Sequence, residues 1–176
     1  MRNSRRRANI SGGSQFGREA TAVLSDASRL VVGWQEWVAL PDLGLPALKA
    51  KIDTGAKTSA LHTHFIEAYG TPKHPRVRFS VRPSPEVGGL EVSATADVVD
   101  RREVISSNGV RELRYVIRTP LSIGGRQWPI EISLTNRELM TYRMLIGRQA
   151  IRSDMLVDCA TSFRQPKLSY QLYAGL

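Results

Sequence analysis

Two extended arms joined by an Asn-Gly pair constrain the fold of this chain more than any other sequence feature. Residues Val104–Ile117 place Asn108-Gly109 between these arms. Both residues tolerate the positive φ of a type I′ turn, so the pair predicts a long β-hairpin with its tip at Asn108-Gly109. A second hairpin is predicted around Gly124-Gly125, between strands at 121–123 and 128–134.

The rest of the domain also has the periodicity of strands. A first strand is predicted over 31–40 and a second over 45–52, joined as a hairpin by the turn Pro41–Gly44. A helix is expected only from about Arg148 to Ser153. Many short strands with one brief C-terminal helix predict an all-β fold, a closed barrel-like domain. Further strands are predicted over 77–81, 90–105 and 144–147.

Residues 1–29 differ in composition from the remainder and show no sustained periodicity. The first 30 residues carry six arginines against Glu19 and Asp26, a net charge of +4, which leaves +5 of the total of +9 for the rest. A basic segment rich in Ser and Gly predicts a disordered arm over 1–29, followed by a β domain over 30–176. Nucleic-acid contact is expected only through this arm, while the basic body favours an acidic peptide or protein substrate.

Cys159 is the only cysteine of the chain, which excludes an internal disulfide and suggests a reducing compartment. No apolar run approaches the roughly 18 to 20 residues that a membrane span needs. The N-terminal arginines are not followed by an apolar segment, so no secretory signal is predicted. We therefore expect a cytoplasmic protein without a membrane partner.

The main candidate for chemistry is Asp53, which follows the predicted strand 45–52. The next residues, Thr54-Gly55-Ala56, are small enough to pack closely beneath a carboxylate. This arrangement would hold the acid rigidly at the floor of a cleft. An Asp-Thr-Gly sequence in an unrelated β-protein is, however, most often a turn closed by the Asp side chain. Lys57 brings a positive charge close to this loop, and the sequence leaves its direction open.

Three features together resemble the retropepsin-like aspartic peptidases. They are Asp53-Thr54-Gly55-Ala56 after a strand, the glycine-tipped hairpin, and an apolar strand that runs into Gly147-Arg148. More closely, residues 51–62 and 142–148 are similar to the bacterial subfamily named ATP-dependent zinc proteases. The resemblance covers most of the domain, from Val32 to Asp158, and it implies a retropepsin-like fold with aspartic peptidase activity.

The resemblance implies that Asp53 supplies one carboxylate of a catalytic pair. Thr54 would brace the loop by hydroxyl hydrogen bonds, and Gly55 would let the backbone approach its partner loop. In aspartic proteases generally, two neighbouring carboxylates share one proton, and the charged member activates a water toward the peptide bond. Because the chain has a single Asp-Thr-Gly, the second acid is expected from a homodimer.

Other residues are expected to support the site. The resemblance implies that the tip of the long hairpin is a flap that closes over the substrate. His62 is expected to hydrogen-bond the Asp53 loop, and Gly147 and Arg148 to be structural residues near the site, Arg148 through an ion pair. The flap residues are Ser106, Ser107, Asn108 and Gly109.

Two other functions stay open. The first is a non-catalytic protein of the same fold that binds or regulates an ATP-grasp glutamate ligase, the partner that the resemblance suggests, or a ribosomal protein. The second is a metal-dependent hydrolase that uses His62 and His64, with His74 or Glu67 completing the ligands. The sequence lacks both the His-Glu-x-x-His motif and a Gly-rich Lys-Ser/Thr phosphate loop, so we expect neither a metal nor a cofactor.

Overall fold

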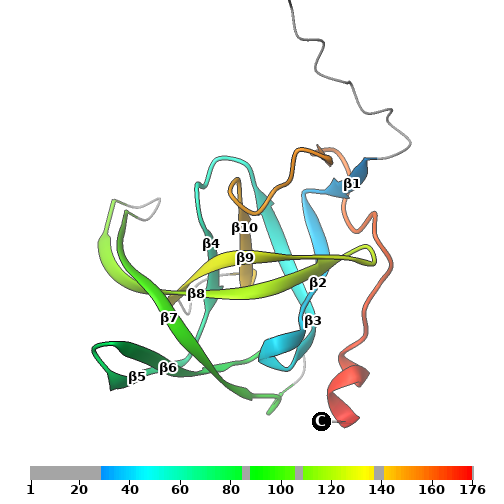
Figure 1. Cartoon of the computed structure of the whole chain (residues 1–176). Helices are drawn as coiled ribbons and strands as arrows, with labels where there is room; N and C mark the ends of the chain where they lie inside the picture. The colour runs from blue at the N-terminus through cyan, green and yellow to red at the C-terminus, as the bar shows by residue number, and fades with distance from the viewer. Residues whose placement is uncertain (1–28, 85–87, 106–108, 137–140, 176) are drawn as a thin grey trace, which may run out of the picture.

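Strands make up most of the computed structural model, which describes residues 29–84, 88–105, 109–136 and 141–175 (Figure 1). The helical segments of these residues are the 3-10 helices η2 (Pro41–Leu43) and η3 (Tyr170–Gly175). The all-β class predicted from the sequence is therefore confirmed. The strands are β1 (Leu30–Gly33), β2 (Gln35–Leu40), β3 (Leu45–Asp53), β4 (Ser59–His62), β5 (Phe65–Thr71), β6 (His74–Val81), β7 (Val92–Ile105), β8 (Arg111–Ile123), β9 (Arg126–Thr135), β10 (Met144–Gly147) and β11 (Met155–Asp158).

Within the described residues, β2, β3, β10, β4, β9 and β8 follow one another in a sheet that closes into a barrel. Ala39 of β2 pairs with Ser122 of β8 and so completes the ring. The sheet continues beyond β8 through β7, β6 and β5, and Figure 1 shows β5 and β6 at the lower left. Val77, Phe79 and Val81 of β6 belong to the same buried hydrophobic cluster as the barrel strands. β1 and β11 pair in parallel as a separate small sheet.

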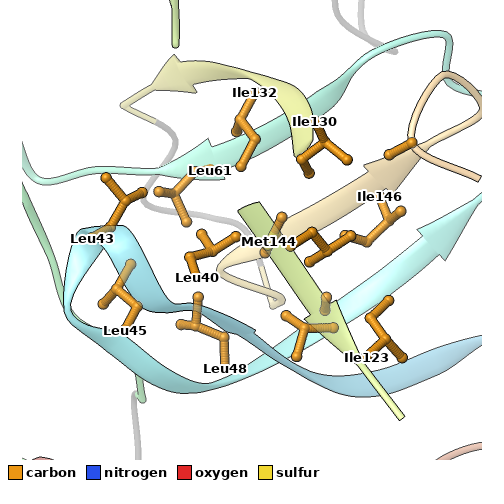
Figure 2. Close-up of a cluster of buried hydrophobic side chains, with 14 of the residues drawn as sticks. Leu40, Leu43, Leu45, Leu48, Leu61, Ile123, Ile130, Ile132, Met144 and Ile146 are labelled. Atoms are coloured by element: carbon orange, nitrogen blue, oxygen red, sulfur yellow. The ribbon is translucent and has the colours of Figure 1, made fainter. Parts of the chain in front are cut away.

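Aliphatic side chains fill the barrel, because alternate residues of each strand point inward. In β3, Leu48, Ala50 and Ile52 are buried, whereas Lys49 is half-buried and Lys51 is exposed. Figure 2 shows leucine and isoleucine side chains from several strands meeting in this interior. Each large aliphatic side chain buried there contributes about 1.5–3 kcal/mol, so the core holds β3 firmly up to its last residue.

The predicted hairpin of β2 and β3 forms, but the strand assignment differs locally. The first predicted strand is divided at Trp34, whose N–H donates to Thr161 O at 2.9 Å and whose carbonyl accepts from Ile52 N at 2.9 Å. β4 is missing from the predicted pattern because all four of its residues are buried between β10 and β9, which removes the alternation. β5 is missing because it is largely exposed at the edge of the sheet.

The helix expected from Arg148 to Ser153 is wrong. The chain makes only turns there, with Ala150 N–H bonded to Gly147 O at 2.9 Å. Trp128 Nε1 donates to Ala150 O at 3.0 Å, so this carbonyl bonds to a neighbouring strand rather than along a helix. The C-terminal helical segment is η3 instead. None of the described residues lies in a helix of the length and apolar character needed to cross a membrane.

Glu36 joins the C-terminal segment to the barrel. Its fully buried carboxylate accepts hydrogen bonds from the backbone N–H groups of Gly33 at 2.8 Å, Arg164 at 2.8 Å and Gln165 at 3.3 Å. A buried carboxylate is tolerated only where donors of this kind replace water. Glu36 therefore ties the end of β1 and residues 164–165 to β2.

Replacing Glu36 by Ala should lower the free energy of unfolding by about 3 to 5 kcal/mol, because three backbone donors would lose their acceptor. Denaturant unfolding followed by circular dichroism measures this change. Glu67→Ala is the control, because Glu67 is exposed and pairs with Arg78 at 3.7 Å; its effect should stay within about 0.5 kcal/mol. An equally small loss for Glu36→Ala would contradict the anchoring role.

Candidate active site

Asp53 is the last residue of β3, and neighbouring strands flank β3 on both sides. Gly147 of β10 is the parallel partner of Asp53, and Gln35 of β2 is the antiparallel partner of Lys51. The Asp53 carboxylate is 26% exposed. Its Oδ1 atom accepts hydrogen bonds from Gly55 N at 3.0 Å and Ala56 N at 3.1 Å, and Lys51 Nζ lies 3.7 Å from Oδ2. One oxygen is therefore fixed by the loop that follows the strand.

Arg148 holds this loop from the other side. Its Nη1 atom donates to Thr54 O at 2.8 Å and to Gly55 O at 2.9 Å, and its backbone N–H donates to Ala56 O at 2.9 Å. Arg148 therefore contacts the loop as a structural residue near the site, and within the described residues its guanidinium bonds to backbone carbonyls instead of the expected carboxylate. The guanidinium recognises backbone carbonyls because the loop turns them toward the end of β10.

Gly147 lies where two backbones touch. A Cβ atom at this position would come within 2.6 Å of both the carbonyl carbon and the carbonyl oxygen of Thr58. The Gly147 N–H donates to Ser59 Oγ at 3.2 Å, which joins the end of β10 to the start of β4. This close approach explains why a glycine must precede Arg148.

A cleft of about 690 Å³ opens between the Asp53 loop and the ribbon formed by β7 and β8. The two strands pair as far as Ile105 and Arg111, so the predicted long hairpin forms. Gly109 has a φ of 79°, as expected for its place near the tip, while Ser106, Ser107 and Asn108 lie outside the described residues. The cleft is lined by Asp53, Gly55, Ala56, Lys57, Thr58, Ala60, Arg102, Glu103, Val104, Ile105, Arg114, Leu145 and Gln149.

The lining shows that Lys57 belongs to the cleft, a point that the sequence leaves open. It also contains two residues that the sequence analysis misses, Arg102 and Arg114. Both belong to runs of charged residues on β7 and β8, and such runs usually indicate a solvated face. Only the pairing of the two strands brings these arginines together in the wall of the cleft that faces the Asp53 loop.

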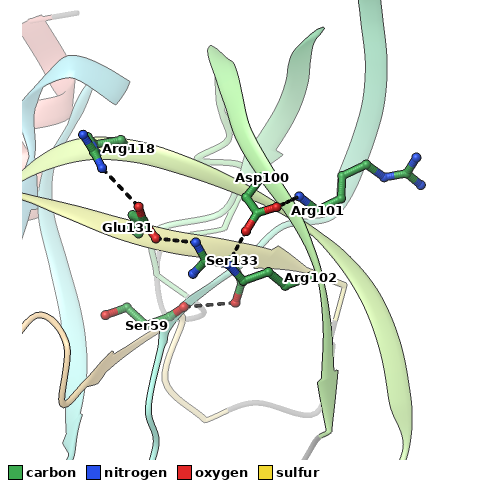
Figure 3. A network of polar contacts seen from close by, with 7 residues as sticks. All are labelled: Ser59, Asp100, Arg101, Arg102, Arg118, Glu131 and Ser133. Carbon is green, nitrogen blue, oxygen red and sulfur yellow. Dashed lines mark hydrogen bonds and ion pairs between the residues drawn. The ribbon is translucent and has the colours of Figure 1, made fainter. Parts of the chain in front are cut away.

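A polar network fixes the base of the hairpin (Figure 3). Arg102 pairs with Asp100 and, through Nη2, with Glu131 Oε2 at 2.7 Å, and Arg118 Nη2 donates to Glu131 Oε1 at 3.2 Å. Hydrogen bonds from Arg102 hold the pKa values of Asp100 and Glu131 below their usual range. The network therefore ties β7 to β8 and β9 with both carboxylates charged.

His62 lies at the end of β4 away from the Asp53 loop, which corrects the expectation that it hydrogen-bonds this loop. Its backbone N–H donates to Arg143 O at 2.8 Å, and it is the strand partner of Thr135. Its ring meets that of His64 edge-on, with 4.7 Å between the ring centres. Burial, assisted by the charges of Arg143 and His64, lowers the pKa of His62 from 6.5 to about 4.

The other expected metal ligands lie apart from this histidine pair. His74 is exposed at the turn between β5 and β6, and Glu67 in the middle of β5 pairs with Arg78. Among the described residues, no group of three or more His, Cys, Asp or Glu side chains is placed to hold a metal ion.

Gly147→Ala should destabilise the fold by about 1–3 kcal/mol and displace the Asp53 loop, because the new methyl group would overlap the Thr58 backbone. Thermal unfolding measures the first effect, and amide chemical shifts of residues 53–58 measure the second. Gly88→Ala is the control, because nothing lies within 4 Å of a Cβ atom there. Equal melting temperatures for the two variants would contradict this close packing.

Acid should weaken the fold through His62. Because its pKa is about 4 when folded and 6.5 when unfolded, the unfolded chain binds the proton more readily between these values. The contribution is full above about pH 6.5 and falls by up to about 3 kcal/mol as the pH approaches 4. The free energy of unfolding, measured between about pH 4 and 6.5, should depend less on pH in His62→Gln than in the wild type. His74→Gln should keep the wild-type dependence. The same slope in His62→Gln would assign the effect to another group.

Comparisons with known proteins agree with this geometry. A model of the family described as RimB-like, retropepsin-like aspartic endopeptidase RimB, matches residues 31–168. A solved structure of a Legionella pneumophila protein of unknown function superposes with a TM-score of 0.62 at 29% sequence identity, covering 77% of this chain and 97% of that one.

Longer proteins contain a similar region. A probable alpha-L-glutamate ligase of Shewanella pealeana is 42% identical over 136 residues, 77% of this chain and 30% of its own length. A protein of the same name from Parasynechococcus marenigrum is 41% identical over 144 residues, 82% of this chain and 29% of its own. This chain thus spans about 30% of the length of these relatives. The chain belongs to the RimB-like family of retropepsin-like aspartic endopeptidases.

Proposed function

We propose that this chain is an aspartic endopeptidase in which Asp53 and its counterpart from a second copy activate a water. The observation that carries the proposal is the position of Asp53 in the cleft beneath the β7–β8 ribbon, with Oδ1 held by two backbone N–H groups. A fixed carboxylate in a peptide-sized cleft is what acid-assisted hydrolysis requires.

The reaction needs a second carboxylate, and the described part of the cleft has no free one. Glu103 is the other acidic residue of the lining, and its Oε1 accepts from Arg111 Nη1 at 2.6 Å. A symmetric pair of chains would bring two copies of Asp53 together across a two-fold axis. One would take a proton from the water while the other, protonated, donates to the scissile carbonyl.

The surrounding residues have positioning roles in this proposal. Arg148 and Gly147 keep the loop against β10, so Asp53 does not rotate away when the substrate enters. The β7–β8 ribbon covers the cleft and would exclude water from the bound peptide. Lys57 and the basic body favour a peptide with acidic side chains.

Regulation of a glutamate ligase is the second candidate function. The relatives named as ligases are about three times longer than the region they share with this chain, so that region is one part of a longer chain. A separate chain of the same family could then bind a ligase, which the sequence analysis expects to be of the ATP-grasp type. Stimulation or inhibition of such a ligase that persists in Asp53→Asn would favour this role over peptidase activity.

Asp53→Asn should reduce peptide cleavage by about 100- to 10,000-fold, because the amide neither accepts the water proton nor shares one with a partner acid. Circular dichroism and sedimentation should show unchanged folding and self-association. Asp97→Asn, at an exposed carboxylate paired with Arg76, is the control and should keep full activity. Undiminished cleavage by Asp53→Asn would rule out the aspartic mechanism.

Mixing the two forms tests the shared site. If each site takes one acid from each copy, only pairs of two wild-type chains are active. An equal mixture of wild-type and Asp53→Asn chains that exchange freely should then have about a quarter of the activity of wild type at the same total chain concentration. Retention of half would place a complete site within one chain.

A further inference from the structure

Arg114 is a buried arginine in the wall of the Asp53 cleft. Its side chain is only 4% exposed, and it lies on β8 opposite the Asp53 loop. Its Nε atom donates to Glu112 Oε2 at 2.7 Å. Its Nη2 atom is buried and has no hydrogen-bond partner within the described residues. Buried guanidinium groups normally use their donors, so an unused one in a cleft wall points to a ligand.

The neighbouring Arg102 differs from Arg114 in the number of carboxylates that bind its guanidinium. Arg102 also lines the cleft, but two carboxylates, those of Asp100 and Glu131, hold it in place. Arg114 has one carboxylate, and Glu112 Oε2 also accepts from Thr135 Oγ1 at 3.1 Å. Arg102 is therefore committed to the fold, whereas Arg114 keeps hydrogen-bonding capacity.

The charge of the cleft favours an anion at this point. Its lining contains three cations, Lys57, Arg102 and Arg114, against the two anions Asp53 and Glu103. Glu103 pairs with Arg111, Arg102 with Asp100 and Glu131, and Arg114 with Glu112, so Lys57 supplies the positive charge that adds to the unused donor of Arg114. Arginine binds a carboxylate through two adjacent N–H groups, and such charge-assisted bonds are strong where water is excluded.

We infer that Arg114 is the specificity-determining residue of the cleft and binds the side-chain carboxylate of a Glu or Asp in the bound peptide. This inference rests on the proposed function in that the cleft receives a peptide, but it does not require cleavage. Glu112 competes with the peptide carboxylate for the same guanidinium. Removing Arg114 and removing Glu112 should therefore change the preference for acidic peptides in opposite directions.

Binding to the full chain carrying Asp53→Asn tests the inference without cleavage. The probes are two capped hexapeptide pools, randomised at all positions but one, which is Glu in the first pool and Gln in the second. The Glu pool should bind about 10- to 100-fold more tightly by isothermal titration, the range expected of a charge-assisted hydrogen bond. Adding Arg114→Gln should bring the ratio of the two affinities close to one, and adding Glu112→Gln should raise it.

The control is Arg78→Gln on β6, because Arg78 is exposed and lies outside both the cleft lining and the network at the base of the hairpin. It removes the same charge and should leave the Glu-to-Gln ratio unchanged. If Arg114→Gln does not fold, the ratio of the two affinities is measured in Glu112→Gln and Arg114→Lys instead. Glu112 is suitable because its side chain is 38% exposed. The inference is overturned if the ratio stays the same in the Arg114 and Glu112 variants, or if neither pool binds. A wild-type chain that cleaves nothing but keeps the ratio would overturn only the proposed function.

Discussion

The contact of two backbones at Gly147 is the constraint on which the site depends. β10 lies between β3 and β4, and its last residue touches both the end of β3 and the segment that enters β4. A side chain larger than hydrogen would separate these segments. Because they touch, Arg148 reaches the carbonyls of Thr54 and Gly55, and the Asp53 loop becomes part of the barrel rather than a surface turn.

Local signals in the sequence predict the parts of the fold that depend on neighbours along the chain. The β2–β3 hairpin, the position of Asp53 at a strand end and the long hairpin all follow from alternation and turn residues. The helix at 148–153 fails because Trp128 takes the Ala150 carbonyl, a contact between residues far apart in the chain. Arg102 and Arg114 are not predicted as cleft residues because their place also depends on contacts between distant residues. Strand pairing decides which face of the charged ribbon lines the cleft.

The histidine pair of His62 and His64 limits the pH range in which the proposed acid chemistry could work. Two carboxylates share a proton most readily at acid pH. His62, however, makes the fold less stable as the pH falls below 6.5, the ordinary pKa of a histidine. The carboxylates of Asp100 and Glu131, whose pKa values are lowered, keep their ion pairs until the pH falls further. The hairpin base therefore stays charged over the pH range in which protonation of His62 weakens the fold. A working pair at neutral pH would need to keep its proton in a cleft with little water.

The two walls of the cleft differ in how they are held. Asp53 comes from the barrel wall, where the core fixes the backbone, whereas Arg114 comes from a two-stranded ribbon whose outer residues Ile105 and Leu113 are 60% and 58% exposed. Among the described residues, the outer part of this ribbon, up to Tyr115, pairs only across its own two strands, whereas β3 has a paired strand on each side. In the proposed function, substitutions on the ribbon would therefore change which peptides bind without displacing Asp53.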